Sequence, residues 1–295
     1  MHSNAEQPKF LVTGAAGQTG RRATQLLLDR GHAVRVFVRA DDDRAGELAG
    51  AGAEVVVGDL LRLDDVSRAL EGVRSAYFVY PIHPGLLEAT AVFAQAATET
   101  GVAAVVNMSQ ISARREAGSN AAQQHWIAEQ LLDRSPFDAT HLRPTFFADN
   151  FLYFRRSIAQ DDVIRLPFGE GRHAPIAAED QARVIAAIME HPESHHGKTY
   201  PLHGPVEMNH HQIAESFSRT LGRVITYQSI EFGKFAELCV EQGYSGHLIQ
   251  HLENVSIDYQ NGVFSGTNDV VTRIGGASPT TIEDFIKAHR AAFMP

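Results

Sequence analysis

The chain has 295 residues, 44% of them hydrophobic, and a formal net charge of -9, a composition typical of a soluble globular protein with one large or two unequal domains. The acidic balance argues against binding to a nucleic-acid backbone, which needs clustered Lys and Arg, and the single cysteine, Cys239, excludes an internal disulfide. No apolar run reaches the roughly 20 residues of a membrane span, and Met1–Lys9 lacks the apolar segment of a signal peptide. We therefore expect a cytoplasmic protein that binds a small molecule, not a membrane or a nucleic acid.

The first predicted element is a short apolar strand, Phe10–Thr13, that leads directly into three glycines spaced three residues apart. Gly14 allows a tight turn after the strand, and Gly17 allows the backbone to approach a pyrophosphate closely. Gly20 allows the following helix to pack closely on the sheet. This spacing is typical of a loop that binds a dinucleotide, although a glycine turn alone is often only a turn.

The sequence after the glycines supports the dinucleotide interpretation. An amphipathic helix is predicted over Arg21–Arg30, and a second strand is predicted over Ala33–Val38. Together with the first strand they form a βαβ unit, in which the amides at the start of the helix, around Gln18 and Thr19, create a site for an anion.

Strands and helices continue to alternate through the first half of the chain. The predicted helices of this part are Arg44–Ala51, Leu61–Leu70, Leu86–Thr100 and Ser119–Arg134. The predicted strands are Glu54–Val57, Ser75–Val79, Ala103–Met108 and Phe137–Leu142. Short β-branched strands that alternate with helices predict a parallel sheet with helices on both faces. The expected fold class is therefore α/β, with a doubly wound parallel Rossmann sheet.

The pattern is less regular after Pro144. The elements predicted there are helices at Ala178–Met189, His211–Leu221, Phe232–Glu241 and Thr280–Phe293, and strands at Thr199–Leu202 and Val224–Gln228. We expect a Rossmann domain over residues 1–150 and a smaller mixed substrate-binding lobe over residues 151–295. We also expect the chain to cross between the two, so that the later part completes the sheet.

The end of the second strand bears on the choice of cofactor. A carboxylate there binds the ribose of NAD, whereas a cation favours the additional phosphate of NADP. Arg39 follows the strand directly and Arg44 is close behind, but Asp41, Asp42 and Asp43 would repel a phosphate unless they point away. The alternative is that Arg39 is only a solvated loop charge. The sequence favours NADP(H) and leaves NAD(H) open.

Two further strand ends carry candidate cofactor contacts. Asp59 and Leu60 follow the third strand, where a carboxylate can accept from the adenine amino group and an apolar side chain can pack on the ring. Alternatively, Asp59 caps the next helix. Val79, Tyr80 and Pro81 end the fourth strand, beside the expected ligand crevice near the second ribose. Tyr80 either contacts substrate or only covers the strand end.

Six motifs are distributed along nearly the whole chain: Gly14–Gly20, Gly58–Leu60, Asn107–Ser109, Leu142–Thr145, Gly197–Pro205 and Gln212–Glu215. Together they resemble the NmrA-like family of atypical short-chain dehydrogenases. The resemblance covers nearly the whole chain and implies a Rossmann fold and NAD(P) binding. It also implies one of two activities: reduction of quinones, imines or other small unsaturated compounds, or dinucleotide sensing that regulates a protein partner.

The resemblance also bears on catalysis. The superfamily uses a Tyr and a Lys four residues apart, in which the tyrosine passes a proton to a carbonyl. Alignment on Glu129 places Ala121 at the tyrosine position and His125 at the lysine position, so the pair is missing. This departure counts against sugar epimerases. The His125 imidazole can donate a proton or bind the nicotinamide ribose, and the alternative is a helix-surface histidine paired with Glu129.

Residues near the ends of the fifth and sixth strands complete the predicted site. Ser109 and Ser112 are candidates for polar contact with nicotinamide or substrate, or they satisfy local backbone groups. The resemblance places the turn of Pro144, Thr145 and Phe146 against the nicotinamide. The aromatic side chains Phe146, Phe147, Phe151, Tyr153 and Phe154 either line an apolar pocket for a flat substrate or join the lobe to the sheet.

The remaining motifs exclude other classes of function. The 15 histidines include neighbouring pairs, but adjacent side chains point in different directions and no metal-ligand spacing occurs, so we expect no metal site. The sequence contains no Gly-x-Ser-x-Gly motif, so it does not indicate a hydrolase of that type. The sequence predicts an NAD(P)H-dependent oxidoreductase for a small, aromatic or quinone-like substrate, with His125, Ser109 and Tyr80 as catalytic candidates. The alternative is a non-catalytic dinucleotide sensor.

Overall fold

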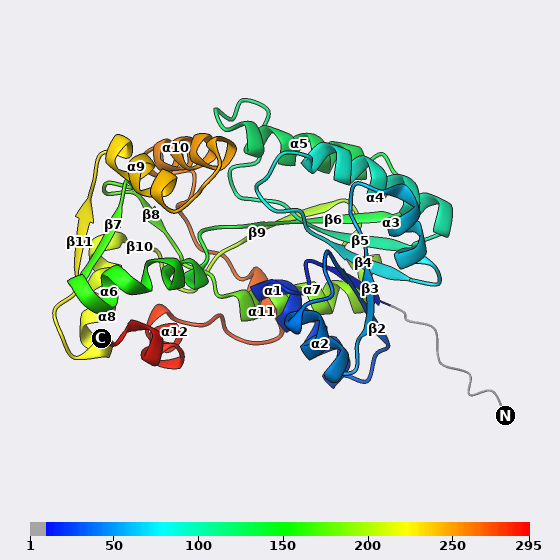
Figure 1. Ribbon diagram of the computed structural model, residues 1–295, viewed down its shortest axis with the longest axis horizontal. Helices are drawn as coiled ribbons and strands as arrows, with labels where there is room; N and C mark the ends of the chain where they lie inside the picture. The colour runs from blue at the N-terminus through cyan, green and yellow to red at the C-terminus, as the bar shows by residue number, and fades with distance from the viewer. Residues whose placement is uncertain (1–9) are drawn as a thin grey trace. The chain divides into compact units, whose positions relative to one another are not determined.

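A computed structural model describes residues 10–295 of the chain (Figure 1), so the prediction made for Met1–Lys9 lies outside the described residues. Its main feature is a seven-stranded sheet in the order β3-β2-β1-β4-β5-β6-β9. The strands are β1 (Phe10–Thr13), β2 (Val34–Val38), β3 (Glu54–Val57), β4 (Ser75–Phe78), β5 (Ala104–Met108), β6 (Asp138–Pro144) and β9 (Lys198–Leu202). Neighbours among the first six strands pair in parallel. This order confirms the predicted doubly wound Rossmann sheet.

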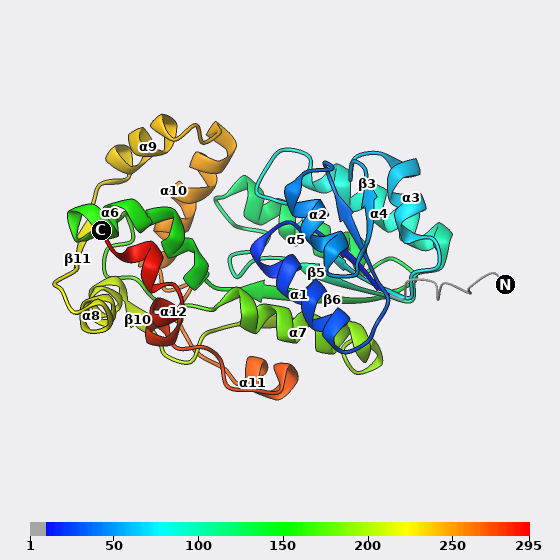
Figure 2. The ribbon, with the colours of Figure 1, turned by 60° about the horizontal axis from the view of Figure 1, so that its bottom comes forward.

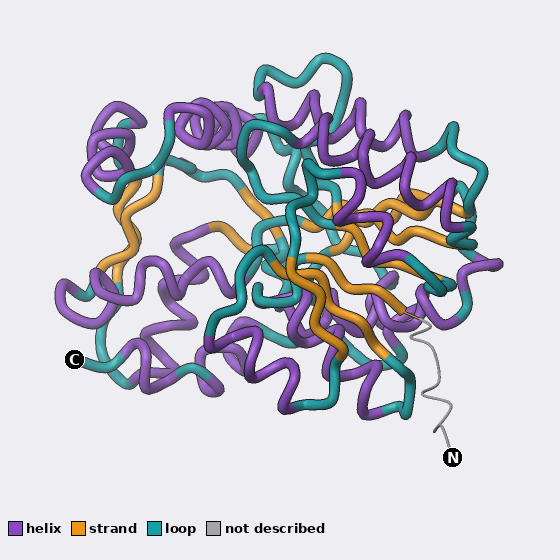
Figure 3. The backbone as a smooth tube through the Cα atoms, turned by 45° about the vertical axis from the view of Figure 1, so that its right-hand side comes forward, coloured by secondary structure: helices purple, strands orange, loops and turns teal. Residues whose placement is uncertain are grey.

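Helices cover both faces of the sheet, as Figures 1 and 3 show. They are α1 (Gln18–Asp29), α2 (Asp43–Gly50), α3 (Leu63–Leu70), α4 (Leu86–Thr100), α5 (Asn120–Leu132) and α7 (Ala178–Glu190). Helices α3 and α4 pack against each other over a core of alanine, valine and aromatic side chains. In that core the rings of Phe78 and Phe93 lie 4.5 Å apart. The alternation of short buried strands with amphipathic helices explains why the sequence predicted this part of the fold closely.

The chain forms two compact units, each assembled from separate stretches. The first contains the described residues through Ser109, with Gln124–Leu142 and Gln181–Tyr200; the second contains Gln110–Gln123, Arg143–Asp180 and Pro201–Pro295. The stretch Gln110–Gln123 after β5 lies in the second unit, and α7 lies in the first unit from Gln181 onward. None of the helices between residues 10 and 295 is both long and apolar enough to span a membrane.

The second unit is mixed α and β. Its elements outside the main sheet are η1 (Ala148–Phe154), α6 (Arg155–Asp161), β7 (Val163–Leu166), β8 (Arg172–His173), β10 (Met208–Asn209), α8 (His210–Leu221), β11 (Thr226–Ser229), α9 (Phe232–Glu241), α10 (Gly246–Gln260), α11 (Val270–Gly275), α12 (Ile282–Ala288) and η3 (Arg290–Phe293). Strand β11 pairs with β7 in parallel, and β10 pairs with β8 antiparallel. Helices α8 and α12 pack together and lie side by side in Figure 2.

An aromatic core stabilises the second unit. The ring of Tyr259 is stacked between those of Phe168 and Phe264, with centroid distances of 4.2 Å to each. Two fully buried histidines, His173 and His210, pack beside this stack. Burying large rings supplies most of the favourable free energy of folding in a small unit of this kind.

Candidate functional site

The glycine loop between β1 and α1 has the geometry that its spacing predicts. Gly14 has a φ of +60°, and a Cβ there would lie 2.5 Å from the Val79 Cγ1 atom. The Gly17 amide donates to the Gly14 carbonyl at 2.9 Å, and a Cβ on Gly17 would lie 3.2 Å from the same oxygen. A Cβ on Gly20 would overlap that carbonyl. Larger residues at these positions would therefore strain the turn.

The start of α1 is open to an anion. Gly17 is the N-cap residue in an extended conformation and offers no side chain to the amides of the first turn, which also carries no acidic residue. Gly14, Gly17 and Gln18 are exposed, whereas Thr19 is buried. The unpaired amides and the helix dipole at such an end favour a phosphate group. The backbone of this loop thus fits a pyrophosphate.

The ends of β1 and β4 are tied together at the point where the strand order reverses. The Val79 amide donates to the Thr13 hydroxyl oxygen at 2.9 Å, and that hydroxyl donates to the Val79 carbonyl at 3.4 Å. Ligands of doubly wound proteins bind outside the carboxyl ends of the strands at this switch point. The hydrogen bonds therefore fix the glycine loop relative to the first residues after β4.

The charges after β2 are not equivalent. Arg39 is exposed and forms no ion pair within residues 10–295. The guanidinium of Arg44, in contrast, pairs with Asp42 at 2.5 Å. Asp42 also caps α2 by accepting from the amides of Arg44 and Ala45 at 3.1 and 3.2 Å. The hydrogen bond from the Arg44 guanidinium, followed by that from the Ala45 amide, lowers the pKa of the Asp42 carboxyl. Arg39 is thus the cation available after β2, and one of the three neighbouring acids is already neutralised by a partner.

Asp59 stabilises a turn and does not cap the next helix. Its carboxylate accepts from the Leu61 amide at 3.0 Å, and its own amide donates to Asp65 at 3.1 Å. Helix α3 begins later, with Arg62 as its N-cap residue. The exposed Asp59 and the half-buried Leu60 therefore stand just beyond β3.

Tyr80 lies near charges that follow two other strands. Partial burial raises the pKa of its phenol, the negative charge of Asp59 raises it further, and the positive charge of Arg39 opposes the rise. The hydroxyl donates to the Pro84 carbonyl at 3.2 Å. Three residues predicted separately at the ends of β2, β3 and β4 are therefore close enough to interact electrostatically, and Tyr80 keeps its proton at neutral pH.

The two serines after β5 differ in their surroundings. The Ser109 amide donates to the Leu142 carbonyl at 2.8 Å, but its buried hydroxyl has no hydrogen-bond partner among the residues that the structure describes. Ser112 is fully buried and donates to the Gln110 side chain at 2.8 Å. A buried hydroxyl without a partner costs free energy, so Ser109 is the serine suited to a ligand contact.

His125 is a buried residue of α5, with 4% of its surface exposed, and Glu129 one turn later is 2% exposed. The alternative of a helix-surface histidine is therefore wrong, because the helix places this side chain inside. Both side chains interact with other residues of the protein. Ala121, one turn earlier, is also buried. Nowhere in the 295 residues does a lysine follow a tyrosine by four positions.

A polar chain beside β5, buried at Asn107 and His141 and exposed at Asp133, was missed by the sequence analysis. The Asn107 amide nitrogen lies 3.1 Å from His141 Nδ1, and His141 Nε2 lies 2.9 Å from an Asp133 carboxylate oxygen. The only signal for it was the presence of polar residues inside two apolar strands. Such a chain satisfies buried polar groups and fixes the register of β5 against β6.

The predicted residues after β6 belong to the second unit. The Thr145 hydroxyl donates to the Ala174 carbonyl at 2.8 Å, and its amide donates to the Leu202 carbonyl at 3.0 Å. Phe146, two residues after the buried Pro144, is half-buried and makes edge contacts with rings of the aromatic core. Of the aromatic residues that follow, Phe151 is fully buried in that core and Tyr153 is 68% exposed. Packing in the aromatic core therefore explains the presence of Phe151.

Titratable side chains do not gather in a metal-binding arrangement. In the described part of the chain, no group of three or more His, Cys, Asp or Glu residues is placed to hold a metal ion. The features that are suited to a ligand are the glycine loop, the Arg39–Asp59–Tyr80 group and the Ser109 hydroxyl. All of them lie in the first unit, at the ends of parallel strands.

These features define a doubly wound α/β protein with an open phosphate-type loop at its first βα turn. A model of the NmrA-like family matches residues 6–286, and the chain belongs to that family. This confirms the resemblance inferred from the sequence motifs.

Curated and solved relatives span more than one function. The chain is 27% identical over 286 residues to the NAD(P)H azoreductase of Xenophilus azovorans, covering 96% of this chain and 99% of that protein. The NADPH complex of an Escherichia coli NADPH-dependent quinone oxidoreductase superposes with a TM-score of 0.85 at 23% identity, covering 95% and 99% of the two chains. NmrA, a negative transcriptional regulator in complex with NADP, superposes with a TM-score of 0.80 at 16% identity, covering 96% and 95%. The fold alone therefore does not decide between an enzyme and a regulator.

Proposed function

We propose that this protein is an NAD(P)H-dependent oxidoreductase that reduces a small aromatic or quinone-like molecule. The observation that carries the proposal is the open glycine loop at the switch point of the sheet, which fits a pyrophosphate. Similarity to an NAD(P)H azoreductase over nearly the full length of both chains supports the same activity. The likeness to a quinone oxidoreductase bound to NADPH supports the cofactor class.

The proposed cofactor contacts follow the strand ends in order. Backbone amides of the loop and the first turn of α1 hold the pyrophosphate, and Arg39 binds the 2′-phosphate of NADP(H). Asp59 and Leu60 contact the adenine, and the Ser109 hydroxyl contacts the nicotinamide. The further proposed contacts are Gly14, Gly17, Gln18, Thr19, Gly20, Val79, Tyr80, Pro81, Pro144, Thr145 and Phe146. With its hydroxyl already bonded to Ala174, Thr145 would act through its backbone.

A bound nicotinamide cofactor supplies the hydride for a reduction of this kind. The chain itself then has to orient the substrate and manage one proton. The phenol of Tyr80 retains its proton because burial and Asp59 raise its pKa, so it acts as a hydrogen-bond donor. His125 is the proposed proton donor, and Ser109 the proposed polar contact. Reduction of a quinone needs no tyrosine–lysine pair, because solvent can supply the proton once the reactants are oriented.

The second candidate function is a dinucleotide sensor that regulates a protein partner without catalysis. The likeness to NmrA in complex with NADP favours it. The lack of any tyrosine–lysine pair at a spacing of four in the sequence fits this function as well.

Turnover separates the two functions. Purified protein is titrated with NADPH by fluorescence, and oxidation of NADPH is then followed with a panel of quinones, azo dyes and polycyclic ketones, with and without oxygen. We expect binding and turnover with at least one acceptor. Binding without oxidation for every acceptor would contradict the enzyme proposal and favour the sensor.

A further inference from the structure

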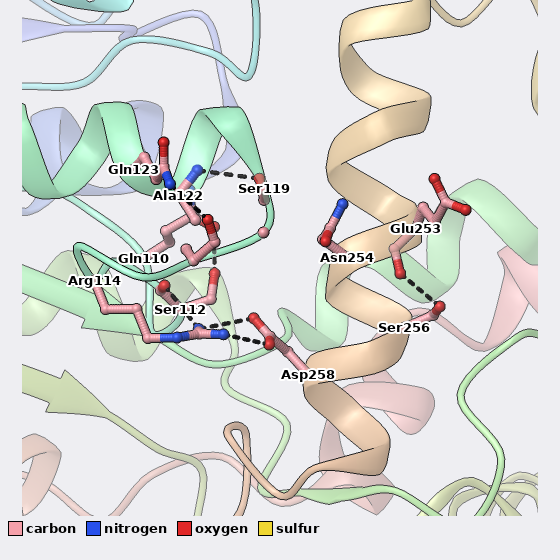
Figure 4. A network of polar contacts seen from close by, with 12 residues as sticks. Gln110, Ser112, Arg114, Ser119, Ala122, Gln123, Glu253, Asn254, Ser256 and Asp258 are labelled. Atoms are coloured by element: carbon pink, nitrogen blue, oxygen red, sulfur yellow. Dashed lines mark hydrogen bonds and ion pairs between the residues drawn. The ribbon is translucent and has the colours of Figure 1, made fainter.

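Helix α10 contacts the segment Gln110–Asn120, which connects β5 to α5 (Figure 4). Four α10 residues make these contacts: Gln250, His251, Asn254 and Asp258. Gln250, Asn254 and Asp258 follow one another at intervals of four, and His251 precedes Asn254 by three, which places them along one side of the helix. Both partners lie within the second unit.

The strongest contact joins Arg114 to Asp258. The two terminal guanidinium nitrogens donate to the two carboxylate oxygens at 2.9 and 2.6 Å (Figure 4). The Asp258 side chain is 7% exposed and that of Arg114 is 37% exposed, and the carboxylate raises the pKa of the guanidinium. Arg114 also donates to the Ser112 carbonyl at 3.1 Å. A bidentate pair with a buried carboxylate holds a loop more firmly than a fully exposed ion pair does.

The C-terminal end of the segment Gln110–Asn120 is held by a second set of hydrogen bonds to α10. The Ser119 hydroxyl and His251 Nδ1 are 2.8 Å apart, and the same hydroxyl accepts from the Ala122 amide at 3.1 Å, which caps α5. The Gln250 side chain accepts from the Asn120 amide at 3.1 Å and donates to the Gly118 carbonyl at 2.9 Å.

A close approach lies between these two contacts. A Cβ on Gly118 would overlap the Asn254 amide oxygen. A side chain at position 118 would therefore require the Asn254 side chain to move away.

The segment is covalently joined to two candidate site residues. Gln110 directly follows Ser109 at the carboxyl end of β5, and Ser119 begins the helix that carries His125. A shift of Gln110–Asn120 therefore changes the backbone path into Ser109 and the starting position of α5.

We propose that α10 is a positioning element for the reaction, in which Asp258 and His251 hold Gln110–Asn120 so that Ser109 and His125 keep their productive positions. This inference rests on the proposed oxidoreductase function. Neither α10 residue is assigned a contact with cofactor or substrate. Asp258 and His251 act on the site through Arg114 and Ser119. Their loss should therefore lower kcat without weakening the phosphate contacts of the glycine loop.

The test uses the full chain with four variants. Asp258→Asn and Arg114→Gln each break the ion pair from one side, and Asp258→Glu keeps the carboxylate. Asp269→Asn is the matched control, because Asp269 pairs with Arg273 at 3.6 Å on the exposed surface of the same unit. Arg114→Gln changes the more exposed partner, so it keeps the test valid if Asp258→Asn does not fold.

Four quantities are measured for each variant that retains its thermal midpoint. They are the NADPH dissociation constant, kcat and KM for an accepted quinone, and the rate of tryptic cleavage after Arg115. We expect Asp258→Asn and Arg114→Gln to lower kcat by about tenfold, because small misplacements near a reacting centre are costly. The NADPH dissociation constant should change less than about twofold, because the glycine loop is untouched. Cleavage after Arg115 should accelerate in both variants, Asp258→Glu should restore much of kcat, and Asp269→Asn should match the unaltered protein.

Unchanged kcat in both variants would overturn the inference, even if cleavage accelerates, because the segment would then be free without affecting the reaction. A lower kcat with unchanged cleavage would also overturn it, since the segment would not have been released. If the unaltered protein fails to oxidise NADPH with any of the acceptors tested, the proposed oxidoreductase function is contradicted, and the positioning role is contradicted with it.

Discussion

His173 and His210 lie together in the aromatic core of the second unit, with ring centroids 5.1 Å apart, and both are fully buried. None of their four ring nitrogens has a hydrogen-bond partner in residues 10–295. Burial lowers the pKa of His210 to about 3 and that of His173 well below its usual value. Both rings are therefore neutral in the folded protein at neutral pH, although either would be protonated in an unfolded chain below about pH 6.5.

This pair makes the folded protein sensitive to acid. Between about pH 6.5 and pH 3 the unfolded chain binds protons that the folded core excludes, so the free energy of unfolding falls as the pH falls. Each histidine contributes up to about 1.4 kcal/mol per pH unit in that range. In urea titrations at pH 7.5 and 5.0, His210→Leu should lose less stability on acidification than the unaltered protein does.

The neighbouring His211 provides the control for this experiment, because its side chain is 52% exposed. His211→Leu should keep nearly the full loss of stability between the two pH values. An identical loss in His210→Leu and the unaltered protein would show that His210 does not titrate on unfolding.

The glycine loop predicts a specific loss of cofactor binding. Gly17→Asp places a side chain against the Gly14 carbonyl and a negative charge at the open end of α1. We expect NADPH affinity to fall by about 100-fold, equivalent to about 2.7 kcal/mol. The matched control is Gly233→Asp, since a Cβ at Gly233 in α9 meets no atom within 4 Å. Tight binding by Gly17→Asp in a fluorescence titration would remove the pyrophosphate from this loop.

Arg39 and Arg44 give a matched pair for cofactor choice. Arg39→Ala should weaken NADPH by about tenfold, the usual scale of a charge-assisted hydrogen bond, while leaving NADH nearly unchanged. Arg44→Ala should have a smaller effect, because Arg44 is already paired with Asp42. Dissociation constants for both cofactors test this. Equal losses for NADPH and NADH in Arg39→Ala would argue against a 2′-phosphate contact.

His125 is tested through the rate and not through binding. If its imidazole donates the proton, His125→Gln should lower kcat by about 100-fold, within the usual contribution of a general acid. His196→Gln is the matched control, since the His196 side chain is 61% exposed and lies outside the candidate site. A kcat equal to that of the unaltered protein would leave His125 with a packing role only.

Local sequence patterns predicted the sheet and most of its helices because each depends on residues that are neighbours in the chain. The bounds of β3, α4 and α9 match the predicted ones. The helix predicted over Thr280–Phe293 instead divides into α12 and η3. The Thr281 side chain caps α12 by accepting from the Asp284 amide.

Helix α10 was missed because its pattern is not that of a simple amphipathic helix. Its buried residues include His251, Ser256 and Asp258 as well as Val255 and Tyr259. A helix with polar residues on a buried face gives little hydrophobic periodicity, so the sequence alone gave no reason to place one there.

In the candidate site, too, some features follow from local sequence and others depend on the tertiary structure. The spacing of Gly14, Gly17 and Gly20 determined a tight turn and an open helix start, because backbone conformation and Cβ clashes act within a few residues. The pairing of Arg114 with Asp258 joins residues 144 positions apart, and that of Ser119 with His251 joins residues 132 apart. Only the tertiary structure decided these pairs, because the free energy that forms them comes from burial and charge brought together by the fold.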